Sequence, residues 1–217
     1  MADIGKGTLA KCDGGVVSGG VLAWLCGDSA AGLKGRRGWA TLTVRCPRGG
    51  IRIRRGMYID ASDLILDRAY AWERQRAQEL FMTQPLGGGG TAQYTWERTL
   101  DESRRMAAYL QSFGFPPGSR IGLLTKNCAH FVMSELAIWM AGYVSVALYP
   151  TLQASTVQYI LEHSESRLLF VGKLDDWESM KPGVADDLPC ISYPLSPPNT
   201  YPTWEDIIRT TQPKVCK

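Results

Sequence analysis

The sequence predicts an α/β fold in which helices cover a mostly parallel sheet. Three short apolar segments, at residues 120–124, 144–148 and 167–171, have the length and composition of buried strands. Segments with apolar residues at helical spacing alternate with them, and glycine or proline separates many of these segments. Strands that alternate with longer helices are typical of βαβ units, whose parallel strands are covered on both faces.

The first element, at residues 62–81, is expected to be a helix. Its apolar residues recur at near-helical spacing, with Ser62 or Asp63 as the cap: Leu64, Ile65, Ala69, Trp72 and Leu80. Pro85 and the four glycines at 87–90 then break the chain. A phosphate-binding loop would need a lysine directly behind the glycines, and none follows, so we interpret them as a flexible turn.

The next segment, 94–97, is expected to be a short strand that runs into a helix capped by Thr95. This helix has an apolar face formed by Leu100, Met106, Ala107, Leu110 and Phe113. Three charged residues of the helix, Glu102, Arg104 and Arg105, are expected to be solvated. Gly114 ends the helix, and the Pro-Pro-Gly sequence at 116–118 turns the chain.

The remaining elements alternate between strand and helix. We expect buried strands at 120–124 and 144–148, further strands at 167–171 and 190–193, and helices at 129–141, 151–163 and 175–180. Thr151 is expected to cap the second of these helices. A last helix begins after Thr203, with Asp206 placed as in a capping box.

The first 56 residues differ from the rest of the chain. They contain 13 of the 23 glycines and a cluster of arginines at positions 36, 37, 45, 48, 52, 54 and 55. We expect this segment to be poorly ordered, because it offers little periodic apolar surface. Two hypotheses describe it: a nucleic-acid-binding segment, or a non-native extension before a domain at 57–217. We favour the extension.

Charge and cysteine content narrow the class of protein. The net charge of +3 is too small to indicate a nucleic-acid or anionic-membrane partner. No apolar run approaches the length of a transmembrane helix. The six cysteines form no C-x-x-C pair and have no histidine at zinc-ligand spacing, so we expect free thiols, no metal site and a cytoplasmic location.

From about Tyr94 to Arg209, an ordered series of short tracts resembles the opening part of AMP-forming acyl-CoA ligases of the acyl-adenylate-forming superfamily. The tracts lie at 94–96, 105–110, 114–121, 126–130, 141–146, 148–152, 160–164 and 167–173. The resemblance is strongest to bacterial long-chain fatty-acid–CoA ligases and implies the N-terminal subdomain of that fold. It also implies a cytoplasmic enzyme of fatty acid metabolism that can lie at the surface of the inner membrane.

The reaction implied by the resemblance has two steps. A carboxylate attacks the α-phosphate of ATP to give an acyl-adenylate and pyrophosphate, and the thiol of CoA then displaces AMP. Mg²⁺ and a Ser/Thr/Gly-rich loop with a lysine neutralise the phosphates. The 217 residues contain no tract like this loop. We therefore expect an N-terminal portion of a ligase that is inactive alone, binds no ATP, Mg²⁺ or CoA by itself, and has no catalytic residue of its own.

Few single residues stand out as candidates for a site. Lys126 and Asn127 follow a predicted strand at its carboxyl end, where α/β proteins bind ligands, and are weak candidates for lining the cleft of a complete enzyme. His130 and His163 are the only histidines, and we interpret both as structural. The acidic pair at 175–176 could bind a cation, but we interpret it as a helix start.

The sequence leaves three functional hypotheses. The first is a ligase fragment whose partner is the missing C-terminal part of the enzyme, with fatty acid and CoA as substrates of the whole. The second is an interaction module that completes a separately encoded ligase half, because truncation would leave a sheet edge and apolar surface open. The third is a nucleic-acid binder that acts through residues 1–56.

Overall fold

The computed structural model describes residues 43–46, 49–52 and 64–213. The chain divides into two units, Met1–Tyr58 and Ile59–Lys217. In the first unit, β1 (Thr43–Cys46) and β2 (Gly49–Arg52) form an antiparallel pair. Residues 1–42, 47–48 and 53–56 of the Gly/Arg-rich segment lie outside the described residues. The proposed order and origin of residues 1–56 therefore stay predictions.

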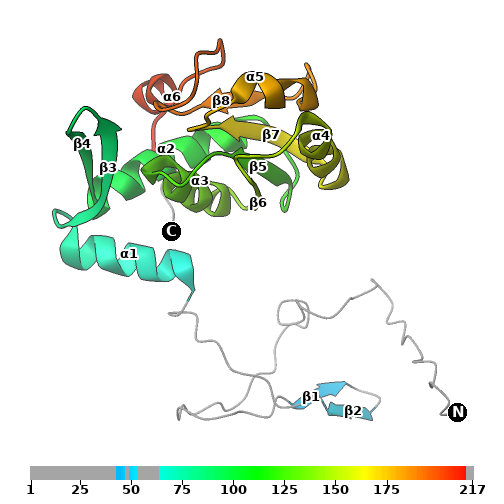
Figure 1. Ribbon diagram of the computed structural model, residues 1–217. Coiled ribbons are helices and arrows are strands. Elements are labelled where there is room, and N and C mark those ends of the chain that lie inside the picture. The colour runs from blue at the N-terminus through cyan, green and yellow to red at the C-terminus, as the bar shows by residue number, and fades with distance from the viewer. Residues whose placement is uncertain (1–42, 47–48, 53–63, 214–217) are drawn as a thin grey trace, which may run out of the picture. The chain divides into compact units, whose positions relative to one another are not determined.

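The second unit is an α/β structure built around a parallel sheet (Figure 1). In chain order its elements are α1 (Ile65–Arg76), β3 (Leu80–Gly87), β4 (Gly90–Thr95), α2 (Trp96–Ser112), β5 (Arg120–Leu124), α3 (Ala129–Met140), β6 (Val144–Leu148), α4 (Ala154–His163), β7 (Ser166–Val171), α5 (Trp177–Met180), the 3-10 turn η2 (Lys181–Gly183), β8 (Cys190–Ser192) and α6 (Trp204–Thr210).

The main sheet has the strand order β6-β5-β7-β8, and every neighbouring pair is parallel. In the register, Arg120 of β5 lies opposite Val144 on one side and Ser166 on the other. This arrangement confirms the fold class predicted from the sequence. It also places β5 and β7, the strands with the most apolar sequences, in the interior of the sheet.

Each face of the sheet packs against its own helices. One core holds β-strand residues such as Ile121 and Phe170 together with α2, α3 and α6. The other holds Leu169 and Val171 with α4 and α5. Successive residues of β7 point to opposite faces and all are fully buried from 168 to 171, so each side chain stabilises the fold by roughly 1.5–3 kcal/mol.

Gly122 explains how α4 can lie close to the sheet. A Cβ atom built on this residue would lie 2.8 Å from Cδ1 of Leu169 and 3.2 Å from Cδ2 of Leu161 in α4. Such contacts are too short for a side chain to fit without displacement. The glycine in the middle of β5 therefore makes room for the Leu161 side chain against the sheet.

The first predicted helix is too long. The helix α1 ends at Arg76, and Leu80 and Phe81 belong instead to β3, which pairs antiparallel with β4. Within the described residues, α1 begins after Leu64 without a side-chain cap, and Ser62 and Asp63 lie outside them. Between β3 and β4 the glycines at 87, 88 and 89 have positive φ angles, which confirms the prediction of a turn there.

Two other details differ from the sequence prediction. The helix α4 begins at Ala154 after Gln153, so Thr151 is not its cap. The strand β6 is an edge strand rather than a buried one, and Val144 is 49% exposed. Both errors concern tertiary context, since the apolar sequence of 144–148 does not reveal that only one neighbour pairs with it.

The predicted caps of α2 and α6 are confirmed. Thr95 Oγ1 accepts a hydrogen bond from the backbone N–H of Arg98 at 3.2 Å. Thr203 Oγ1 accepts from the backbone N–H of Asp206 at 3.2 Å and donates to the Asp206 carboxylate at 2.8 Å. These contacts satisfy backbone N–H groups that have no partner inside the helix.

Candidate functional site

The carboxyl end of β5 is the point where the chain changes face. After β5 the chain enters α3, which packs on one face of the sheet, whereas β6 and β7 on either side lead to α4 and α5 on the other face. Crevices open where neighbouring connections leave in opposite directions, and α/β proteins bind ligands there. The loop that follows β5 contains Lys126 and Asn127, so the structure places both sequence-predicted candidates at this position.

Lys126 does not have a free charge. Its ammonium group forms an ion pair with the carboxylate of Asp175, from the segment that follows β7. The Lys126 side chain is 36% exposed and that of Asp175 is 73% exposed. Asn127, the second candidate, is exposed. The pair is therefore close enough to solvent to open for a ligand at small energetic cost.

A hydrogen-bonded latch joins the loop after β5 to the loop after β7. Thr125 Oγ1 accepts from the backbone N–H of Lys173 at 2.9 Å and donates to the carbonyl of Lys126 at 2.8 Å. The backbone N–H of Lys126 donates to the carbonyl of Lys173 at 2.8 Å. These contacts fix the backbone that carries Lys126 and Asn127, and sequence reasoning missed them.

Gly172 permits this latch to form. A Cβ atom on Gly172 would lie 2.2 Å from Thr125 Oγ1 and 2.5 Å from Cδ2 of Tyr193. No side chain fits at these distances. A glycine directly after an apolar strand was the available sequence signal for a close backbone approach.

His130 lies in a buried aromatic cluster at the start of α3. Its ring packs against Tyr94, Tyr193 and Trp204, with centroid distances of 5.8, 5.6 and 5.2 Å. Among the described residues, the His130 Nδ1 atom is buried without a hydrogen-bond partner. Burial, followed by the nearby charge of Arg98, lowers the pKa of His130 from 6.5 to about 4, so the ring is neutral at pH 7.

His163, the other histidine, ends α4 and is exposed, where its ring stacks on Tyr159 at 5.5 Å. It makes no contribution to the buried cluster around His130. The two histidines therefore lie in different environments, one in the core and one on the surface of a helix.

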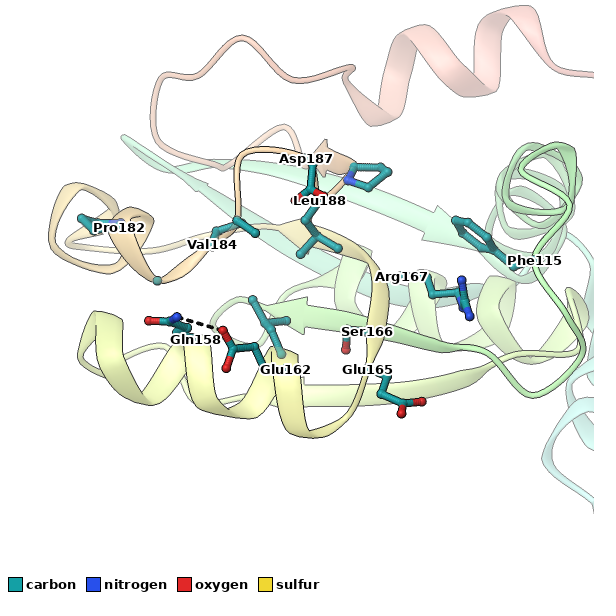
Figure 2. A pocket seen from close by; sticks show the side chains of 14 residues that line it. Phe115, Gln158, Glu162, Glu165, Ser166, Arg167, Pro182, Val184, Asp187 and Leu188 are labelled. Atoms are coloured by element: carbon teal, nitrogen blue, oxygen red, sulfur yellow. Dashed lines mark hydrogen bonds between the residues drawn. The ribbon is translucent and has the colours of Figure 1, made fainter.

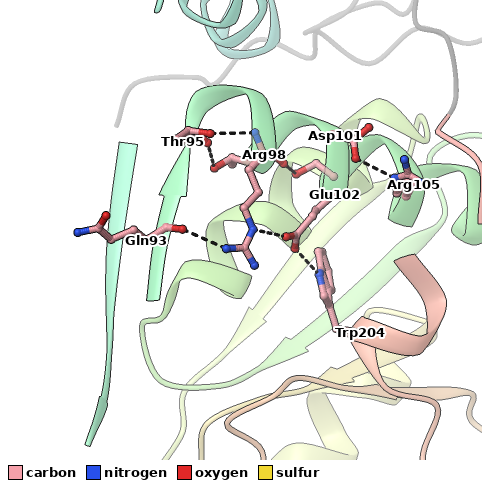
Figure 3. Close-up of polar contacts among 9 residues, drawn as sticks. Gln93, Thr95, Arg98, Asp101, Glu102, Arg105 and Trp204 are labelled. Carbon is pink, nitrogen blue, oxygen red and sulfur yellow. Dashed lines mark hydrogen bonds and ion pairs between the residues drawn. The ribbon is translucent and has the colours of Figure 1, made fainter. Parts of the chain in front are cut away.

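Glu102 corrects a sequence prediction, because it is buried rather than solvated (Figure 3). Its carboxylate accepts hydrogen bonds from Trp204 Nε1 at 3.0 Å and from Arg98 Nε at 2.8 Å. Arg98 also lies over the ring of Tyr94, with Cζ 4.4 Å from the centroid. The network connects α2, α6 and the β3–β4 hairpin beside the His130 cluster.

The other two charged residues of α2 are also in ion pairs. Arg104 pairs with Glu73 of α1, and this contact raises the pKa of Arg104. Arg105 Nε donates to Asp101 at 2.8 Å. Both arginine side chains are only partly exposed, so the prediction that they are solvated was also incomplete.

A cavity of about 470 Å³ lies at the opposite edge of the sheet, near the amino ends of β7 and β8 (Figure 2). Its lining includes Phe115, Leu161, Val184 and Leu188, together with the charged residues Glu162 and Arg167. Neither Lys126 nor Asn127 borders it. The cavity is therefore separate from the loops at the carboxyl ends of the strands.

The described part of the chain contains no group of three His, Cys, Asp or Glu side chains that could hold a metal ion. The acidic residue Asp176 instead caps α5, and its carboxylate accepts from the backbone N–H of Ser179 at 3.2 Å. Within the same residues, no helix is long and apolar enough to cross a membrane.

Comparison with known proteins gives a consistent family. A sequence model described as "AMP-binding enzyme" matches residues 69–207, which is more than half of the chain. The chain is 30% identical over 100 residues to the peroxisomal acetate/butyrate–CoA ligase AAE7 of Arabidopsis thaliana, covering 46% of this chain and 18% of that protein. It is 30% identical over 125 residues to fatty acyl-CoA synthetase A of Dictyostelium discoideum, covering 56% and 19%. The chain thus spans less than a fifth of the length of these curated relatives.

Solved structures show the same fold. The chain superposes on the anthranilate CoA ligase AuaEII in complex with anthranoyl-AMP with a TM-score of 0.60 at 22% identity, covering 72% of this chain and 31% of that one. Acetoacetyl-CoA synthetase from Streptomyces lividans also gives 0.60, at 21% identity, covering 70% and 26%. The parallel sheet with its flanking helices is thus the fold found in part of these ligases. Together with the sequence match, these observations show that the chain belongs to the AMP-binding enzyme family.

Proposed function

We propose that this chain contributes one region of an AMP-forming acyl-CoA ligase. In the family reaction, a carboxylate oxygen attacks the α-phosphorus of ATP and pyrophosphate leaves; the CoA sulfur then attacks the acyl carbon and AMP leaves. The observation that carries the proposal is the family match over residues 69–207, supported by relatives that are named acyl-CoA ligases. ATP, Mg²⁺ and CoA are the expected substrates and metal of the whole enzyme.

Within that enzyme, we assign the described residues to scaffolding and to one wall of the ligand crevice. Lys126 and Asn127 lie at the carboxyl end of the central strand β5 and are held by the Thr125 latch. The Ser/Thr/Gly-rich loop that holds phosphate in this superfamily has no counterpart among the 217 residues. The chain therefore needs residues from outside its sequence to bind ATP.

A fatty acid is the proposed acyl substrate, and a long-chain acid is the finer proposal. The Dictyostelium relative is named a fatty acyl-CoA synthetase, and another relative, at 32% identity over 77 residues, is the long chain acyl-CoA synthetase 1 of Arabidopsis thaliana. The relatives are of mixed origin and include one named for acetate and butyrate, so a specific kinship with bacterial long-chain ligases is not confirmed. We place the enzyme in the cytoplasm as part of this proposal.

A hybrid enzyme tests the proposal. The matching region of the Dictyostelium synthetase is replaced by residues 69–207 of this chain, and acyl-CoA formation is measured with acids of different length. The proposal predicts acyl-CoA formation that depends on ATP and CoA, whereas a relative with the region deleted is inactive. A hybrid that folds and binds ATP but makes no acyl-CoA contradicts the proposal. The hypothesis of a separate assembly module has no support from the comparisons.

A further inference from the structure

The strand β6 has one open edge. Within the described residues it pairs with β5 alone. The backbone N–H of Val144 donates to the carbonyl of Ser119 at 2.9 Å, which fixes the direction of the alternating pattern. In a parallel pair, every second residue directs both of its backbone polar groups to the same neighbour. The N–H and C=O groups of Ser145 and Ala147 therefore point away from β5, toward the open edge.

This edge lacks the features that usually prevent further pairing. Natural proteins protect edge strands with charged residues, proline or a bulge. The sequence of β6 is Val-Ser-Val-Ala-Leu, without a charge or a proline, and its pairing with β5 has no register shift. Val144 is 49% exposed and Tyr149, which follows the strand, is 78% exposed. Neither end of the strand is thus covered, and the open backbone groups fit another β-strand.

We propose that this edge pairs antiparallel with the β6 edge of a second copy of the chain. A two-fold axis at Val146 places Ser145 opposite Ala147 of the second copy, and Ala147 opposite its Ser145. Both residues direct their N–H and C=O groups outward, so this register satisfies all of them with hydrogen bonds between the copies. The register is self-complementary because the outward residues lie symmetrically about Val146.

The side chains suit a second copy more than a charged partner strand. Val146 and Leu148 face α4, and Val144 shares their face by alternation. In the symmetric register, Val146 lies beside its own counterpart and Val144 lies beside Leu148 of the other copy. No charged residue of β6 opposes itself, so self-pairing brings no like charges together. The two sheets become one continuous sheet, and this inference is independent of the proposed function.

Sedimentation equilibrium of the whole chain tests the assembly. The chain has a mass of 23.9 kDa, and we expect twice that mass with a concentration-dependent equilibrium. Ala147→Pro should give a monomer, because it removes an outward N–H while leaving the bonds to β5 intact. Ala147→Val keeps the N–H and is the matched control, which should remain a dimer. Circular dichroism establishes that both variants are folded.

A designed cross-link tests the register. Residues that face each other in a non-hydrogen-bonded antiparallel pair have Cα atoms about 4.5 Å apart, which a disulfide can bridge. Val146→Cys should therefore form a disulfide between two copies under mild oxidation, identified as a 146–146 linkage by mass spectrometry. A wild-type chain that is monomeric at every concentration overturns the proposal, and so does an Ala147→Pro variant that dimerises as strongly as the wild type.

Discussion

The carboxylate of Glu102 accepts a hydrogen bond from the indole Nε1 of Trp204 at 3.0 Å, across 102 positions of sequence. The contact joins the long helix α2 to the last helix, α6. Since Glu102 is 7% exposed and Trp204 is fully buried, the bond forms in a region with little access to water. This contact and its neighbours lead to predictions that can be measured on the isolated chain.

Replacement of the buried carboxylate should destabilise the fold. Glu102→Ala leaves the Trp204 N–H and the Arg98 guanidinium without their acceptor, so we expect a loss of about 2–3 kcal/mol in the free energy of unfolding. Urea denaturation followed by tryptophan fluorescence measures it. Glu97→Ala, on the exposed part of the same helix, is the control and should change stability by less than about 0.5 kcal/mol. Equal effects of the two substitutions would show that the buried bond is unimportant.

Stability should fall on mild acidification because of His130. Its pKa is lowered to about 4 in the folded state, so between roughly pH 6.5 and 4 the unfolded chain binds a proton that the folded chain does not. The free energy of unfolding therefore decreases as the pH falls through this window, by on the order of 3 kcal/mol in total. His130→Phe removes this contribution and should flatten the dependence.

The control for the acid effect is His163→Gln, which retains His130 and should retain its contribution. The measurement is urea denaturation of the three proteins at several pH values between 7 and 4. A wild type and a His130→Phe variant with parallel profiles would contradict the assignment of this pH dependence to the buried ring.

Gly172 should not tolerate a side chain. Gly172→Ala places a methyl group 2.2 Å from Thr125 Oγ1, so the latch between the loops after β5 and β7 must open or shift. Overpacking of this kind costs about 1–3 kcal/mol. At Gly90 the nearest heavy atom to an added Cβ lies at 3.5 Å, so Gly90→Ala is the matched control. Thermal unfolding compares them, and equal melting temperatures would exclude a packing role for Gly172.

Lys126 should matter for activity more than for stability. Its ion pair with Asp175 is exposed, so Lys126→Ala should change the free energy of unfolding by less than about 1 kcal/mol. In the hybrid ligase, loss of one charge-assisted hydrogen bond of about 1.5–3 kcal/mol should lower kcat/KM by about tenfold or more. Asp175→Ala breaks the same ion pair but keeps the lysine, and should retain more activity. An unchanged kcat/KM for Lys126→Ala would remove this residue from the ligand crevice.

The parallel core could be predicted from the sequence because its signals are local. The strands β5 and β7 are apolar on both faces, and only strands between two helical layers have that composition. Thr95 and Thr203 were recognisable as caps for the same reason, since the groups that they bond lie three residues away. The position of Lys126 and Asn127 at a strand end followed from the order of the elements.

The errors have non-local causes. Leu80 and Phe81 continue a helical spacing, but pairing with β4 draws them into a strand. Glu102 has the composition of a solvated helix position, and its burial depends on Trp204 far along the chain. The partner of Lys126 and the latch at Thr125 likewise join segments that are nearly 50 residues apart. Periodicity contains no information about such contacts.

The central claim is that this chain forms part of an AMP-forming ligase but cannot bind ATP with its own residues. Isothermal titration calorimetry with ATP and Mg²⁺, applied to the chain and to the hybrid ligase under the same conditions, tests it most directly. We predict saturable, Mg²⁺-dependent binding by the hybrid and no binding by the chain alone. Saturable, Mg²⁺-dependent ATP binding by the chain alone would contradict the account.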